Sequence, residues 1–279
     1  MVEAIEDLFV PVLIYNNTKE DSGLLKKFDE PSWNNPVTRF LNSEGNDVIQ
    51  RKDRVWNLQP MAARMTEALK AADQKIPRYL NDMAIPTDKL ELATFAMHCY
   101  WVGESKLGSI DGVTNTVSGW AGGLEVVQVT FDPTKVAYAK LLQTAQSFDC
   151  ASKVFAHNES QLKIAKSAVR ELAVKAPKDS RKAKLSDQKY HLRNTKAIRN
   201  LSLTTFQSTK LNSMVSTGGN FETVLSPRQR ELLAKVQAKL KSSSAASLNK
   251  FVFPDDDSKL QEYQTSLIEQ LDAVKMKRK

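Results

Sequence analysis

The sequence contains only two cysteines, Cys99 and Cys150, among its 279 residues. Two thiols are too few for a disulfide-stapled scaffold or a structural zinc site, so we expect free thiols or one functional pair, no bound metal, and a reducing compartment such as the cytoplasm. No apolar run approaches the roughly 20 residues that cross a bilayer, and no basic and then apolar leader opens the chain. These absences favour a cytoplasmic globular protein without a membrane partner.

The net charge of +8 is unevenly distributed along the chain. Residues 161–243 contain 18 Lys and Arg but only 5 Asp and Glu. A basic segment of this kind fits either solvated helix faces or an anionic partner such as RNA or an acidic protein. Because the segment lacks interleaved aromatic residues and any nucleic-acid-binding motif, solvated faces are the favoured interpretation, and a nucleic-acid partner stays an open alternative.

The first part of the chain has the pattern of half an α/β unit. We expect a strand, the two strands of a hairpin and a helix, at Leu8–Tyr15, 36–41, 47–51 and 58–72 respectively. With its Trp-Asn-Asn-Pro run at 33–36, this arrangement resembles the second half of a thioredoxin-like domain. Residues 1–98 contain no cysteine and therefore no redox Cys-x-x-Cys motif. Residues 1–85 are thus expected to form a partial thioredoxin-like domain that cannot itself pass electrons through thiols.

The stretch from Phe95 to Pro133 contains one of the two cysteines and two of the four tryptophans. Its pattern predicts a strand at Leu90–Met97 and a helix that starts at Cys99. A turn at Gly112–Thr116 and a glycine-rich loop at Gly119–Gly123 then lead to a second strand at Glu125–Phe131. Further on we expect a short strand at 154–155 and helices at 135–147, 160–173, 204–215, 227–241 and 258–279. Ser226 is the expected N-cap of the helix at 227–241.

Cys99 is a candidate nucleophile because a cysteine at the start of a helix lies near unsatisfied backbone amides, which stabilise a thiolate. The alternative is a buried cysteine that acts as a small hydrophobic residue. The neighbouring sequence favours chemistry: Tyr100, Trp101 and Trp120 can wall an apolar pocket beside the thiol, and Glu125 can serve as a proton donor.

Several runs together resemble the peptide methionine sulfoxide reductase A family. That family has a Gly-Cys-Phe-Trp motif, a Gly-Tyr-x-Gly-Gly loop, a His-Ala-Glu-Val-Val strand, a His-Asp-Pro-Thr run and a Gln-Lys-Tyr-Tyr-Leu run. The matching segments of this chain are Cys99-Tyr100-Trp101 with Glu104, Gly119–Gly123, Glu125-Val126-Val127, Ser147–Cys150 and Gln188–Arg193. The resemblance covers about residues 90 to 240.

The resemblance implies a ferredoxin-like domain of the α+β class at residues 86–200, followed by a basic helical extension at 201–279. It also implies a reaction in which the Cys99 thiolate attacks the sulfur of free or peptidyl methionine sulfoxide while Glu125 protonates the oxygen. Tyr100, Trp101 and Trp120, together with Asp149, would then bind the substrate. Cys150 would resolve the resulting sulfenic acid, and an external thiol reductant such as thioredoxin would complete the cycle without a bound cofactor.

The chain also departs from the family pattern near the site. His98 replaces the glycine before the cysteine, Trp120 replaces the loop tyrosine, and the loop before Glu125 is shortened. The family segment after the Asp-Pro run is missing and is replaced by residues 151–157. These changes keep two alternatives open: a catalytically degenerate binding module whose basic tail engages an acidic or nucleic-acid partner, and a generic disulfide- or peroxide-reactive thiol protein.

Overall fold

The computed structural model describes residues 1–31, 37–148 and 152–273. Three features singled out in the sequence lie outside these residues: Asp149, Cys150 and the Trp-Asn-Asn-Pro run at 33–36.

The chain divides into two compact units, Met1–Thr87 and Asp88–Lys279. Helices and a mixed sheet together confirm the expected α+β class. The separation of a sulfoxide-reductase-like domain from a helical extension at residue 200 stays a prediction, because both parts lie within the second compact unit.

The N-terminal unit is mainly helical, with one short pair of strands. Its elements are α1 (Val2–Leu8), α2 (Ser22–Lys27), β1 (Val37–Thr38), β2 (Lys52–Asp53), α3 (Leu58–Ala71) and α4 (Arg78–Met83). Buried side chains of α3 recur at helical spacing, which confirms the predicted helix, and they pack with the following residues: Ala4, Phe40 and Leu80. The Glu30 carboxylate links this unit further, since hydrogen bonds from Arg51 and then Arg39 lower its pKa to about 2.

The strand predicted at Leu8–Tyr15 is wrong. Leu8 ends α1, and the residues that follow it pair with no strand among the described residues. Val10 and Val12 are 91% and 73% exposed. Pro11 lacks a backbone N–H and no described edge lies alongside, so β-branched composition alone is not enough to form a strand here. The second strand of the predicted hairpin, at 47–51, is also wrong: β1 pairs with β2 at Lys52–Asp53, and the predicted strands are joined by the isolated bridge Leu41–Asp47.

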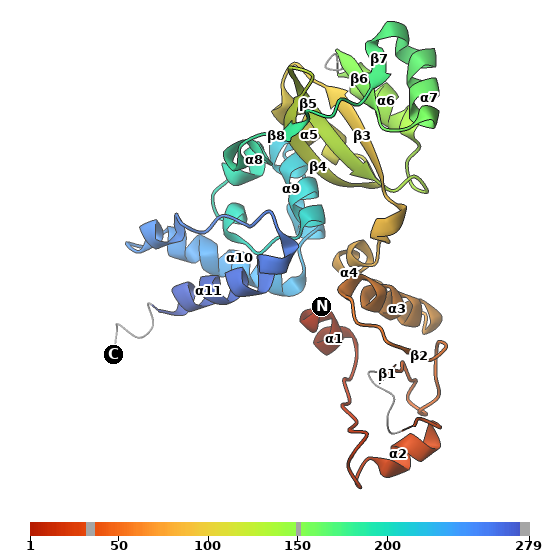
Figure 1. The fold of residues 1–279 in the computed structure, drawn as a ribbon. Helices are drawn as coiled ribbons and strands as arrows, with labels where there is room; N and C mark the ends of the chain where they lie inside the picture. Colours follow the sequence, from red (N-terminus) through yellow and green to blue (C-terminus); the bar gives the residue numbers. More distant parts are fainter. Residues whose placement is uncertain (32–36, 149–151, 274–279) are drawn as a thin grey trace. The chain divides into compact units, whose positions relative to one another are not determined.

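The C-terminal unit is built on a six-stranded sheet with the order β7-β6-β3-β5-β4-β8 (Figure 1). Its strands are β3 (Glu91–Ala96), β4 (Val113–Ala121), β5 (Leu124–Phe131), β6 (Lys153–Ala156), β7 (Ala173–Lys175) and β8 (Arg181–Lys182). Helix α5 (Tyr100–Gly108) connects β3 to β4, and α6 (Tyr138–Ser147) connects β5 to β6. This β-α-β-β-α-β order with antiparallel pairing confirms the ferredoxin-like topology.

The sheet buries one face beneath its helices. Alternating residues of β5, Val127, Val129 and Phe131, are fully buried in the main core, together with Leu107 of α5 and Leu141 of α6. One helix prediction and one turn prediction need correction. Helix α7 (Glu159–Val169) ends earlier than residue 173, which belongs to the unpredicted strand β7, and residues 113–116 form the start of β4 and no turn.

The glycine-rich loop predicted at Gly119–Gly123 is also wrong, because β4 continues through Ala121. The connection to β5 is the two-residue turn Gly122-Gly123, whose φ angles of +55° and +76° suit a type I′ hairpin. Gly119 has a different role. A Cβ atom at this position would lie 2.5 Å from the carbonyl oxygen of Arg181, so only glycine permits the close approach of β8.

The remaining helices form a second core within the C-terminal unit. They are α8 (Tyr190–Arg193), α9 (Thr205–Thr217), α10 (Pro227–Leu240) and α11 (Leu260–Asp272), and the three predicted helices in this region are confirmed. Ser226 caps α10, since its hydroxyl accepts the Gln229 N–H at 3.2 Å. Helix α9 lies against α5: Ser213 Oγ donates to the Ser105 carbonyl at 2.5 Å.

Candidate active site

Cys99 lies where strand β3 ends and helix α5 begins, as the sequence predicted. It is the N-cap residue of α5, has extended backbone angles (φ −144°, ψ 112°), and its carbonyl accepts the Gly103 N–H at 3.1 Å. Its side chain is partly buried and carries a free thiol. The start of a helix presents backbone N–H groups that have no helical acceptor, so the thiol lies at a point where anions are stabilised.

Glu125, near the start of β5, lies at the same helix N-terminus. Its Oε2 accepts the backbone N–H of Tyr100 at 3.0 Å, and its carbonyl accepts the Met97 N–H at 2.8 Å. The carboxylate is therefore anchored on the residue that follows Cys99. Its cross-strand neighbour in the β4–β5 hairpin is Trp120. Two of the predicted site residues, Glu125 and Trp120, are thus neighbours, and Glu125 is bonded to the residue that follows Cys99.

Tyr100 is buried beside Trp120, with the two rings at 79° and their centroids 6.1 Å apart. Burial, followed by the negative charges of Asp187 and Glu125, raises the pKa of the Tyr100 hydroxyl. The phenol is therefore neutral at physiological pH and carries a proton. Tyr100 therefore provides both an apolar ring and a polar hydroxyl group at the residue that follows Cys99.

Trp101 stacks on Tyr190, with parallel rings whose centroids are 3.9 Å apart. Tyr190 was not among the predicted site residues, although it belongs to the Gln188–Arg193 run that carries the family resemblance. The family run indicated that Tyr190 is important, but the sequence did not predict that its ring would stack on Trp101. The aromatic cluster is therefore larger than predicted and combines residues from α5, β4 and α8. We call it the aromatic wall; its members are Tyr100, Trp101, Trp120 and Tyr190.

Two buried side chains anchor the run that carries Tyr190. Gln188 pairs with the backbone of Ser118 in β4: its Nε2 donates to the carbonyl at 2.7 Å and its Oε1 accepts the N–H at 3.0 Å. Lys189 Nζ lies 3.2 Å from Glu104 Oε1 and also donates to the Thr116 carbonyl, while the Lys189 N–H donates to Glu104 Oε2 at 2.7 Å. These bonds join α5 and β4 to the two residues that precede Tyr190 and helix α8.

The variant Lys189→Met is expected to reduce the free energy of unfolding by about 3–5 kcal/mol, because it leaves the Glu104 carboxylate buried without its counter-ion. Glu104 is 0% exposed and Lys189 is 4% exposed, so water cannot replace the lost ammonium group. Urea unfolding followed by tryptophan fluorescence measures the change. Lys184→Met, at an exposed position nearby, is the matched control and should be neutral. A change below about 1 kcal/mol for Lys189→Met would mean that the pair is not buried as described.

The remaining predicted site residues, Asp149 and Cys150, lie outside the described residues. The next described residue is Ser152, whose N–H donates to the carbonyl of Ala96 in β3 at 3.1 Å.

The basic segment at 161–243 presents fewer free charges than its composition suggests. Four of its cations, Lys189, Arg193, Lys210 and Lys239, are buried. Each donates hydrogen bonds to carbonyl or carboxylate oxygens inside the unit; for example, Lys210 Nζ donates to the carbonyls of Gly108 and Ile110 at 2.9 Å and 2.6 Å. Part of this charge is therefore structural.

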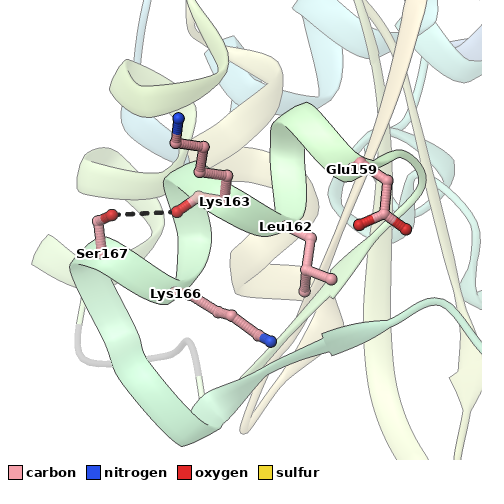
Figure 2. A pocket seen from close by; sticks show the side chains of 5 residues that line it. All are labelled: Glu159, Leu162, Lys163, Lys166 and Ser167. Atoms are coloured by element: carbon pink, nitrogen blue, oxygen red, sulfur yellow. Dashed lines mark hydrogen bonds between the residues drawn. The ribbon is translucent and has the colours of Figure 1, made fainter.

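A shallow hollow along α7 is lined by Glu159, Leu162, Lys163, Lys166 and Ser167 (Figure 2). It contains neither Cys99 nor Glu125 and is separate from the thiol site. Within residues 1–31, 37–148 and 152–273, no cluster of His, Cys, Asp and Glu could hold a metal ion. Over the same residues, no helix has both the length and the apolar character needed to cross a membrane.

Several known proteins that are similar to this chain share the name peptide methionine sulfoxide reductase. The chain is 30% identical over 126 residues to a peptide methionine sulfoxide reductase MsrA of Pseudomonas syringae pv. tomato, covering 33% of this chain and 54% of that protein. It is 32% identical over 120 residues to the protein of the same name from Thermus thermophilus, covering 32% of this chain and 68% of that protein. The chain belongs to the peptide methionine sulfoxide reductase A family. It is a divergent member, and no family model matches it.

A peptide methionine sulfoxide reductase of Drosophila melanogaster is 29% identical over 172 residues, covering 47% of this chain and 70% of that protein. The chain spans about half the length of the Pseudomonas syringae relative. As a member of the peptide methionine sulfoxide reductase A family, it places His98 and Trp120 where the family motifs have glycine and tyrosine. Trp120 is part of the aromatic wall, and His98 is an exposed residue that precedes Cys99 in the chain.

Proposed function

We propose that this protein reduces methionine sulfoxide, with Cys99 as the nucleophile and Glu125 as the proton donor. One observation carries the proposal: Glu125 Oε2 accepts the N–H of Tyr100, the residue that follows Cys99, at 3.0 Å. A sulfur nucleophile and a carboxyl group are thereby held at one helix N-terminus. Such a pair can act on the sulfur and the oxygen of the same small functional group.

In the first step the Cys99 thiolate attacks the sulfoxide sulfur, and the Glu125 carboxyl group delivers a proton to the oxygen. The sulfur–oxygen bond of the substrate breaks as the hydroxyl group passes to the cysteine sulfur. The products are methionine and a sulfenic acid at Cys99. The cysteine sulfur loses as many electrons as the substrate sulfur gains, so this step needs no further oxidant or reductant.

The aromatic wall supplies the binding energy for the substrate methyl group. Tyr100 and Trp120 meet edge to face, and Trp101 is held by its stack on Tyr190. Rings fixed in this way lose little freedom when a methyl group packs against them, so that the sulfoxide sulfur is directed toward the thiol. As the family resemblance implies, we also propose Asp149 as a substrate-binding residue.

Cys150 is the proposed resolving thiol. It is the only cysteine of the sequence besides Cys99, so it is the only thiol of this chain that can condense with the sulfenic acid. Condensation of the sulfenic acid with this thiol forms a disulfide and releases water. A thioredoxin-type dithiol then reduces the disulfide. This cycle suits a reducing compartment, and we propose the cytoplasm.

A single-turnover experiment tests the proposal. Protein incubated with a methionine sulfoxide peptide and no reductant is expected to yield one reduced peptide per protein molecule and a Cys99–Cys150 disulfide, both measured by mass spectrometry. In Cys150→Ser the first turnover should persist, and the sulfenic acid should be trapped at Cys99 by dimedone. Later turnovers with thioredoxin should be slower than in the wild type.

The outcomes separate the two cysteines. If neither protein forms reduced peptide, the proposed reductase function is wrong. If both form it and the wild type shows no disulfide, Cys99 acts as proposed and Cys150 does not. Methionine sulfone peptide, which has no oxygen that can be transferred in this way, is the control substrate.

The alternative of a binding module without catalysis depends on the basic segment. Because four of its cations are buried and bonded internally, the segment offers a weaker anion-binding surface than its composition predicts. The proximity of Cys99 and Glu125 has no role in such a module. For these two reasons we propose the enzyme.

A further inference from the structure

An exposed cation lies beside the aromatic wall of the proposed active site. Arg181 is the first residue of the edge strand β8, and it pairs with Trp120 in β4, which pairs in turn with Glu125 in β5. Directly opposed residues of antiparallel strands point to the same face of a sheet. Arg181, Trp120 and Glu125 therefore form one row across three strands, on the face that carries helix α5 and Cys99.

The Arg181 side chain is held in place but keeps its donors available. Its guanidinium lies over the Trp120 ring, 5.5 Å from the ring centroid. It is exposed and makes no side-chain hydrogen bond or ion pair with any described residue. A guanidinium that rests on an aromatic face keeps its N–H groups at its edge, in a fork that matches a carboxylate.

The backbone beneath Arg181 is fixed by contacts that are already present. Strand β8 approaches so closely that a Cβ atom on Gly119 would meet the Arg181 carbonyl oxygen at 2.5 Å. Two residues further on, Ala183 N–H donates to the Ser118 carbonyl at 2.9 Å. The position of the cation relative to the active-site row is thus set by the sheet and does not depend on a loop.

We propose that Arg181 binds an acidic side chain of the substrate, so that the protein prefers peptides that carry Asp or Glu a few residues away from methionine sulfoxide. The proposal rests on the reductase function proposed above and names its substrate class. Two strand spacings separate Arg181 from Glu125, which is roughly 10 Å. An extended peptide advances about 3.3 Å per residue, so the acidic residue lies about three positions from the sulfoxide.

Lys182 provides a matched control within the same strand. It is exposed, carries the same charge and pairs with Gly119. Because successive residues of a strand point to opposite faces, Lys182 lies on the face away from Cys99. If the acidic peptide residue binds on the active-site face, replacing Arg181 will weaken binding and replacing Lys182 will not. A general attraction of acidic peptides to the basic protein would make the two replacements equivalent.

The test compares three peptides that differ only in having Glu, Gln or Lys three residues from methionine sulfoxide. Their affinities for the Cys99→Ser protein are measured by fluorescence anisotropy, and KM is measured with the wild type. The Glu peptide is expected to bind about two- to fivefold more tightly than the Gln peptide, as for an exposed ion pair. This preference should disappear in Arg181→Gln, persist in Lys182→Gln, and persist in part in Arg181→Lys.

Equal affinities for the three peptides would overturn the proposal, and so would a preference that survives in Arg181→Gln or is lost in Lys182→Gln. Failure of the reductase function is distinguishable from failure of this inference. Peptide preference without turnover contradicts the proposed reaction and leaves Arg181 as an anion-binding residue. Turnover without peptide preference contradicts the role of Arg181 and leaves the reaction intact.

Discussion

Cys99→Ser is expected to abolish the reduction of a methionine sulfoxide peptide by dithiothreitol. A serine hydroxyl at the N-cap of α5 can occupy the same position, but it is a much weaker nucleophile than a thiolate and cannot form a sulfenic acid. Dithiothreitol bypasses the resolving thiol, so the assay reports on the first step. The measurement is the rate at which reduced peptide appears, followed by liquid chromatography.

His98→Asn is the control for this experiment. His98 precedes Cys99 and is exposed, and adjacent side chains of an extended segment point in opposite directions. Its replacement should leave turnover within about twofold of the wild type, because an exposed residue away from the pocket has little effect on stability. Serine is tolerated at helix N-caps, so the Cys99→Ser protein should also remain folded. Unchanged turnover in that folded variant would exclude Cys99 as the nucleophile.

The local parts of the site could be predicted from the sequence because they depend on short-range patterns. An apolar run that stops at Cys99, followed by residues with helical spacing, was enough to place the thiol at the start of α5. The alternation in Glu125–Phe131 was enough to identify β5. The family motifs then supplied the order of these pieces, from which the ferredoxin-like topology followed.

The wrong predictions concern segments whose local structure is determined by a distant part of the chain. The Leu8–Tyr15 segment has strand composition, but the structure offers it no edge to pair with among the described residues. Gly119 has the composition of a loop, yet it lies within β4 because β8, about sixty residues later in the chain, requires a residue without a side chain. Composition indicates what a segment tolerates, and the partner decides what it forms.

Tyr190 shows the same limit within the site itself. Its stack on Trp101 joins two residues far apart in the chain, and it depends on Lys189, which adopts a left-handed backbone conformation (φ +50°) as it enters the buried contact with Glu104. Neither the positive φ of a lysine nor its burial is favoured by residue type. The motif indicated that this run matters, whereas its contacts required the structure.

Glu125→Gln is expected to lower kcat by about 100- to 10,000-fold, the usual contribution of a positioned proton donor. The side-chain oxygen of glutamine can still accept the Tyr100 N–H, so the start of α5 and the aromatic wall should remain in place. The amide cannot supply a proton to the sulfoxide oxygen. KM should therefore change little, because the interaction that is lost operates in the transition state and contributes nothing to substrate binding.

The rate of sulfenic acid formation distinguishes the two active-site variants. Cys99→Ser should form no dimedone adduct at any time, whereas Glu125→Gln should form the full adduct slowly, because its nucleophile is intact. Glu171→Gln, which changes an exposed carboxylate of the same unit, should react at the wild-type rate. If Glu125→Gln forms the adduct within about threefold of the wild-type rate, the proton comes from elsewhere. The role of Glu125 would then be limited to accepting the Tyr100 N–H at the start of α5.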